Sequence, residues 1–107
     1  MQTVLKGMTL IDGTGRVIED AVLVFEDEYI LAAGSAKDTE VPDEAIFYNL
    51  KGKYVIPGLI DTHIHLDMHG MADTYHESLV EDKLRTIRAT LEMGNTVRAG
   101  FTTVRNA

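Results

Sequence analysis

The chain has 107 residues, of which 45% are hydrophobic and 25% charged, and it carries a net charge of −7. This composition is typical of a globular protein, and the acidic balance argues against nucleic acid or an anionic membrane as a partner, because both require clustered Lys and Arg. The chain has no cysteine, which excludes disulfides, thiolate metal sites and a cysteine nucleophile. A chain of 107 residues is expected to form one domain with a modest core.

Short strands separated by turns are predicted for the first half of the chain. The sequence Asp12-Gly13-Thr14-Gly15 predicts a turn after the first strand, and the polar residues 34–44 predict a loop. The first three strands are therefore expected to form an antiparallel meander. The predicted strands are residues 3–11, 21–25, 29–33, 45–50 and 54–56.

Residues 59–66 alternate between an apolar face and a polar face, as expected for a strand. The polar face contains Asp61, His63 and His65. The Cα atoms of the two histidines would lie about 6.6 Å apart, so both imidazoles can converge on one metal ion. A strand with one face in water would show the same alternation, so the periodicity alone leaves both interpretations open.

A helix followed by a strand is predicted for the rest of the chain. The sequence Ser78-Leu79-Val80-Glu81 has the spacing of a capping box, so the helix should begin at about Leu79. It could end at Gly94 or continue to Gly100, which is a favourable residue after a helix. The β-branched residues 101–105 then predict a strand parallel to residues 59–66. Both histidines would lie near the carboxyl end of their strand, which carries the active site in α/β barrels.

Three segments in this order resemble the amidohydrolase superfamily of metal-dependent hydrolases. They are Ile11-Asp12-Gly13-Thr14-Gly15, the run Lys51-Gly52-Lys53-Tyr54-Val55-Ile56-Pro57-Gly58-Leu59-Ile60-Asp61-Thr62-His63-Ile64-His65, and Gly100-Phe101-Thr102-Thr103-Val104-Arg105. The combination looks most like the imidazolonepropionase and prolidase-like branch. The resemblance covers the N-terminal portion of such a protein.

The resemblance implies an α/β fold in which antiparallel β-sandwich strands are followed by the first βαβ unit of an incomplete (β/α)8 TIM-type barrel. Residues 1–57 would be the sandwich portion and residues 58–107 the start of the barrel. By the same resemblance, His63 and His65 are metal ligands for one or two divalent ions, with zinc expected. Members of the family add a lysine, two histidines and an aspartate from later strands. Where the family commonly has Asp after the Thr-Thr-Val-Arg run, this chain has Asn106.

The resemblance also implies the chemistry of the complete protein. A metal held by these histidines would activate water for attack on an amide or peptide C–N bond, as in a dipeptidase, a carboxypeptidase or a cyclic-amide hydrolase. The chain alone is expected to be inactive, because two histidines are fewer ligands than catalytic zinc usually has. The alternatives are a non-catalytic assembly module and a deaminase of the same superfamily.

Four other residues are candidates for contact with the substrate or for orienting neighbouring residues of the site. They are Asp61, His69, His76 and Arg105. The substrate would be a small or peptide-like molecule, and the chain is expected to need the rest of the barrel, with homo-oligomers left open. Residues 1–12 lack the basic start and apolar run of a signal peptide, so a cytoplasmic location is expected.

Overall fold

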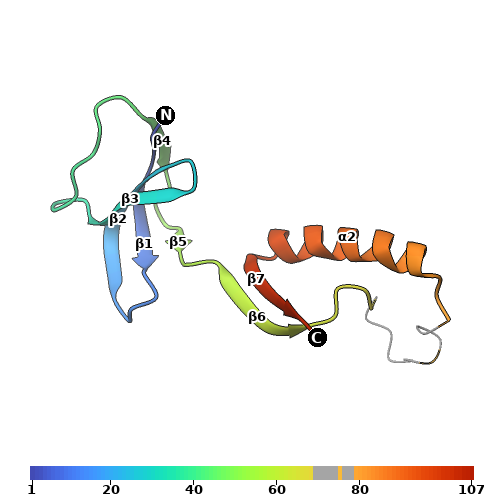
Figure 1. Ribbon diagram of the computed structural model, residues 1–107. Coiled ribbons are helices and arrows are strands. Elements are labelled where there is room, and N and C mark those ends of the chain that lie inside the picture. Colours follow the sequence, from blue (N-terminus) through green and yellow to red (C-terminus); the bar gives the residue numbers. More distant parts are fainter. Residues whose placement is uncertain (69–74, 76–78) are drawn as a thin grey trace. The chain divides into compact units, whose positions relative to one another are not determined.

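The computed structural model describes residues 1–68, 75 and 79–107. Residues 1–57 and 58–107 form two compact units (Figure 1), each with a sheet of its own. The elements of the described residues are, in order, five strands and then strand, helix and strand. The α/β fold class expected from the sequence, with an N-terminal β region before a βαβ unit, is therefore confirmed.

The first unit is a mixed five-stranded sheet. Its strands are β1 (Thr3–Ile11), β2 (Val17–Glu26), β3 (Tyr29–Ser35), β4 (Ile46–Asn49) and β5 (Tyr54–Val55), and the order across the sheet is β3-β2-β1-β4, with β5 also paired to β1. The β1-β2-β3 meander is antiparallel as predicted. In contrast, β4 and β5 run parallel to β1, where antiparallel strands were expected. The long connection between β3 and β4 makes this possible, because it returns the chain to the starting end of β1.

The core of the first unit lies on both faces of this sheet. One cluster contains Val4, Val22 and Val24, and a second contains Met8, Leu10 and Ala21. A regular strand would place Val4 and Met8 on the same face. They belong to different clusters because β1 has a bulge between Lys6 and Met8, where Gly7 adopts a φ of +79°. The bulge at Gly7 thus places Met8 on the opposite face of the sheet from Val4.

The turn between β1 and β2 is held by the carboxylate of Asp12. Its Oδ1 accepts hydrogen bonds from the backbone N–H of Thr14, at 2.9 Å, and from the Thr14 hydroxyl, at 2.8 Å. Its Oδ2 accepts a hydrogen bond from Nε of Arg16 at 2.8 Å. These contacts, led by the backbone bond of Thr14, lower the pKa of Asp12 to about 2. The turn predicted from the sequence is therefore confirmed.

We expect the pKa of Asp12 to rise in the variant Thr14→Val, because the hydroxyl bond is lost while the backbone bond is kept. The folded pKa lies below the ordinary value of 3.8. The stability contributed by Asp12 is therefore present above about pH 4 and is lost as the pH falls toward 2. A titration of the Asp12 side-chain carbon by NMR would measure the shift. An Asp12 pKa that stays at about 2 in Thr14→Val would contradict this assignment.

The second unit is the predicted βαβ unit. It consists of β6 (Leu59–Ile64), α2 (Asp82–Arg98) and β7 (Phe101–Asn106), and β6 and β7 are parallel. The helix begins three residues later than expected, with Glu81 at the N-cap and no side-chain hydrogen bond at that cap. It continues through Gly94 and ends before Gly100, whose φ of +98° is the left-handed conformation that favours glycine. Residues 69–74 and 76–78, between β6 and α2, lie outside the described residues.

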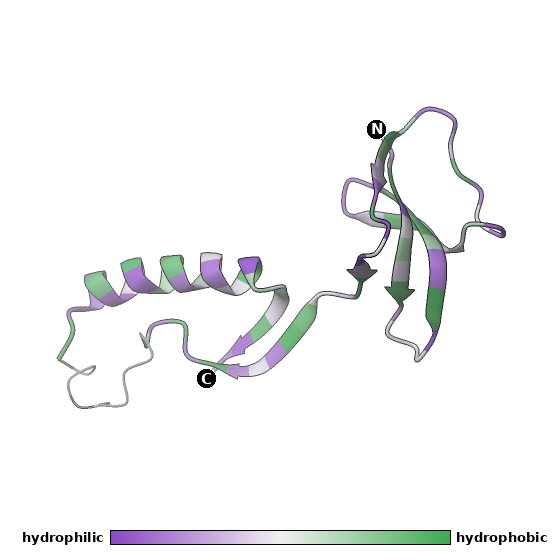
Figure 2. Ribbon diagram, turned by 180° about the vertical axis from the view of Figure 1, so that it is seen from behind, coloured by the Kyte–Doolittle hydropathy of each residue, from purple (hydrophilic) through white to green (hydrophobic). Residues whose placement is uncertain are grey.

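The apolar side of α2 is exposed. Ile87, Leu91 and Val97 have exposed fractions of 61%, 64% and 66%, and no residue of the helix is buried. Figure 2 shows apolar and polar residues alternating along the helix. No described element covers this apolar stripe. The helix is also not long and apolar enough to cross a bilayer, and no other helix among the described residues meets that requirement.

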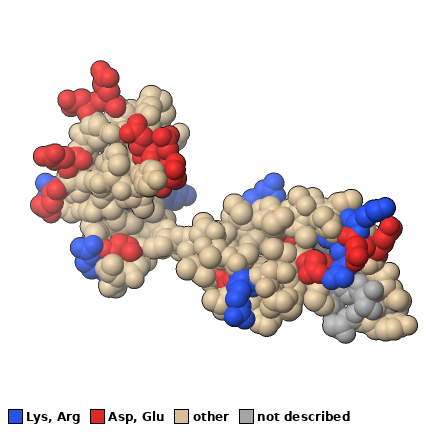
Figure 3. Space-filling view, viewed as in Figure 1, with Lys and Arg blue, Asp and Glu red and all other residues tan. Residues whose placement is uncertain are grey.

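The charge of the first unit is mainly acidic on the face shown in Figure 3. Asp and Glu side chains project from several places on this face, and few Lys or Arg side chains lie between them. A surface of this kind repels phosphate groups.

Candidate metal centre

The two histidines of the predicted metal site lie side by side at the end of β6. His63 is the penultimate residue of β6, and His65 follows its final residue, Ile64. Their ring centroids are 5.1 Å apart and the rings are inclined by 80°. Both side chains are exposed. The structure thus brings the two imidazoles together where one ion could contact both.

A bulge in β6 sets the position of His63. The pairs Asp61–Val104 and Ile64–Asn106 enclose one more residue in β6 than in β7. The backbone N–H of His63 donates to Oδ1 of Asp61 at 3.0 Å. The half-buried carboxylate of Asp61 therefore supplies an acceptor within the irregular part of the ladder. Strict alternation of side chains, as assumed from the sequence, does not describe this part of the strand.

His65 contacts the residue that follows β7. Its Nδ1 lies 2.9 Å from the backbone oxygen of Ala107. A carbonyl oxygen only accepts, so Nδ1 is the donor in this contact, and in the neutral imidazole Nε2 then carries the lone pair. Metal-binding histidines commonly have one ring nitrogen held in this way, which fixes the tautomer that binds the ion. The structure therefore presents His65 in a state suited to a metal.

An ion pair fixes the segment that follows His65. The guanidinium of Arg85, in α2, contacts Oδ2 of Asp67, and both side chains are about one-third exposed. The hydrogen bond from Arg85 lowers the pKa of Asp67. This contact joins the segment after β6 to the helix. The sequence does not identify Asp67 and Arg85 as partners. They are 18 residues apart, and no helical or strand periodicity relates their positions.

The remaining predicted site residues are only partly placed. His69 and His76 lie outside the described residues, and Arg105 is exposed in β7. Within residues 1–68, 75 and 79–107, no group of three His, Asp or Glu side chains could hold a metal. His63 and His65 fit a divalent metal as two nitrogen donors, and a catalytic zinc usually has three protein ligands. The described part of the chain thus provides part of a site.

Comparison with known proteins agrees with this arrangement. The sequence model of the amidohydrolase family matches residues 54–107, about half of the chain. The chain belongs to the amidohydrolase family. The match includes β6, α2 and β7 and both histidines, so the residues of the candidate metal centre lie in the part that defines this membership.

Relatives in the amidohydrolase superfamily are much longer than this chain. It is 40% identical over 63 residues to an imidazolonepropionase of Micrococcus luteus, a match that covers 59% of the chain and 15% of the relative. It is 36% identical over 104 residues to a dihydroorotase of Caldanaerobacter subterraneus, covering 97% of the chain and 20% of the relative. The crystal structure of a Xaa-Pro dipeptidase with bound methionine matches the whole chain and 26% of its own length, with 27% identity and a TM-score of 0.84. The chain therefore corresponds to the N-terminal portion of these proteins.

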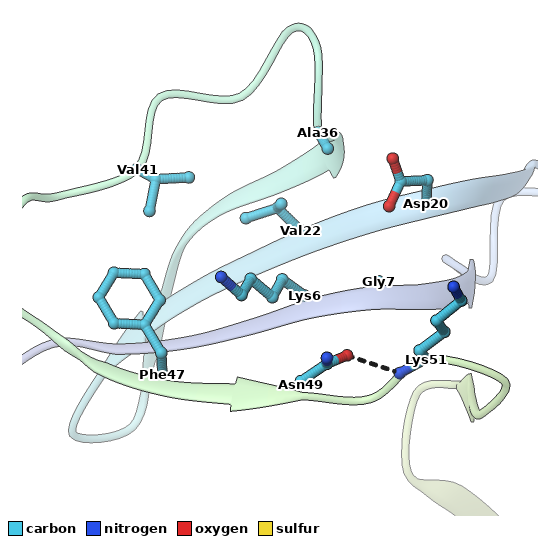
Figure 4. A pocket seen from close by; sticks show the side chains of 9 residues that line it. All are labelled: Lys6, Gly7, Asp20, Val22, Ala36, Val41, Phe47, Asn49 and Lys51. Carbon is cyan, nitrogen blue, oxygen red and sulfur yellow. Dashed lines mark hydrogen bonds between the residues drawn. The ribbon is translucent and has the colours of Figure 1, made fainter.

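The amidohydrolase chain also has a hollow in its first unit (Figure 4). Its volume is about 710 Å³. Lys6 lies with its Nζ 5.2 Å from the ring centroid of Phe47, and Oδ1 of Asn49 accepts a hydrogen bond from the backbone N–H of Lys51. Asp20 is the one carboxylate among the described lining residues, which include no histidine. The hollow thus adds no second metal-binding group in this part of the chain.

Proposed function

We propose that this chain is the N-terminal part of a metal-dependent hydrolase that cleaves an amide or peptide C–N bond, with His63 and His65 as two of the metal ligands. The observation that carries the proposal is the paired arrangement of these imidazoles at the carboxyl end of a parallel strand. Family membership supports the same chemistry. In the proposed fold, residues 1–57 belong to a β-sandwich and residues 58–107 begin a barrel.

The chain's own residues would hold and orient the reacting groups. Nε2 of His65 is left available by the contact with Ala107, and the His63 ring lies beside it. Asp61 would fix the backbone of His63. A bound divalent metal, which we propose to be zinc, activates water and polarises the substrate carbonyl in enzymes of this type. His69, His76 and Arg105 are proposed as further contacts for the substrate.

The exposed apolar stripe of α2 supports a larger protein. Leu84, Ile87 and Leu91 would each have apolar area removed from water if another helix packed beside α2. Such burial is worth about 25 cal/mol per Å². We therefore propose that later elements of a barrel cover this stripe. The proposed enzyme would act on small or peptide-like substrates in the cytoplasm.

The proposal is tested by metal analysis and hydrolysis assays of the full-length protein. We expect about one or two equivalents of a divalent metal per chain, and release of product from a dipeptide or a cyclic amide. Removal of the metal with a chelator should abolish this activity, and Zn²⁺ should restore it.

Residues 1–107 alone are the control in the same assays. They should be inactive, because they supply two metal ligands. A full-length protein that stays free of metal, or that is active after chelation, would overturn the proposal. Release of ammonia from amino-substituted rings in place of amide cleavage would indicate a deaminase.

A further inference from the structure

The end of β7 makes three contacts with the segment that carries the second histidine. The backbone N–H of Ala107 donates to the carbonyl of Ile64 at 2.9 Å, and the Ala107 carbonyl accepts from His65. The third contact comes from a side chain. Oδ1 of Asn106 accepts a hydrogen bond from the backbone N–H of Leu66 at 2.9 Å. These contacts hold the residues on both sides of His65.

The side-chain contact begins where the strand pairing ends. The last paired residues of the two strands are Ile64 and Asn106, so no residue of β7 is paired with Leu66 in the ladder. The N–H of Leu66 therefore has the Asn106 side chain as its acceptor in place of a strand carbonyl. An N–H group left without an acceptor would let this segment leave its position. Even a small displacement of a metal ligand lowers the affinity for the metal, because the site requires a fixed ligand geometry.

We infer that Asn106 is a positioning residue for the metal ligand His65, and that its side-chain oxygen is the atom that does this. The inference rests on the proposed function. The family commonly has aspartate at this position. An aspartate would place an equivalent oxygen at the same distance from the backbone, so asparagine can take over this role. The role belongs to the acceptor oxygen that asparagine and aspartate share.

Zinc affinity of the full-length protein tests the inference. In Asn106→Ala we expect the affinity for Zn²⁺ to fall by about 10- to 100-fold, the usual cost of losing a group that orients a metal ligand. In Asn106→Asp we expect an affinity equal to that of the wild type or tighter, because the acceptor is kept and a negative charge is added. Competition with a chromophoric chelator measures both, and thermal unfolding reports whether each variant folds.

Asn49→Ala is the matched control. Asn49 also accepts a backbone hydrogen bond through Oδ1, but it does so in the first unit. Its loss should leave the zinc affinity unchanged, and an equal loss in both alanine variants would overturn the inference. So would wild-type affinity in Asn106→Ala. If Asn106→Ala fails to fold, Asn106→Asp decides alone, and a tenfold loss in that variant refutes the role of the oxygen. A wild-type protein without zinc would instead refute the proposed function itself, and this inference with it.

Discussion

Full-length protein carrying His63→Ala or His65→Ala is expected to lose its bound metal and its hydrolytic activity. Each substitution removes one of two imidazoles whose centroids are 5.1 Å apart. Loss of groups that merely orient a ligand weakens metal binding by about 10- to 100-fold, so loss of a ligand itself should cost more than about 100-fold. Metal content after gel filtration and the rate of amide cleavage measure the effect.

His76→Ala is a suitable control for these variants. It makes the same substitution in the same chain, at a residue proposed to contact the substrate. We therefore expect it to keep the metal, whatever its effect on the reaction. The experiment thus distinguishes His63 and His65 as metal ligands from the same residues as ordinary polar side chains. If His63→Ala and His65→Ala keep a full equivalent of metal, the histidines are ordinary polar residues at the end of a strand.

The regular elements could be predicted because their sequences repeat with the period of the structure. The first strand, residues 3–11, has the predicted bounds, and the turn at Asp12 follows from its side-chain oxygen and the neighbouring glycines. The end of α2 at Gly100 follows from the left-handed conformation that glycine adopts easily. Local chemistry decides these features, so a single sequence contains the necessary information.

The irregular features of the candidate site could not be predicted in the same way. The bulge at His63 breaks the period of two, and its compensation by Asp61 depends on the pairing with β7. The contacts from Asn106 and Ala107 connect residues about forty positions apart. No spacing rule describes contacts between distant segments, because they arise only when the strands have paired. The sequence shows Asn106 only as a departure from the family pattern.

Gly58 immediately precedes β6, and its Cα lies close to the side chain of Thr102 in β7. A Cβ atom added to Gly58 would lie 2.7 Å from the Cβ of Thr102, and still closer to the outer atoms of that side chain. Thr102 is the extra residue of β7 between the pairs Leu59–Phe101 and Ile60–Thr103. A bulge at this position directs its side chain against Gly58. The glycine after Pro57 is therefore required by close packing of the strands.

We expect Gly58→Ala to destabilise the full-length protein by about 2 kcal/mol or more, because the contact involves a Cβ atom that is fixed to the backbone and the strands must move apart. Denaturant unfolding measures the change. Adding Thr102→Ala should restore only part of the stability, since the Cβ of residue 102 remains. Gly94→Ala is the matched control: it lies in α2, where the added methyl group meets Arg98 at 3.4 Å, and it should stabilise by up to about 1 kcal/mol. An unchanged midpoint for Gly58→Ala would show that β6 and β7 are not held this closely.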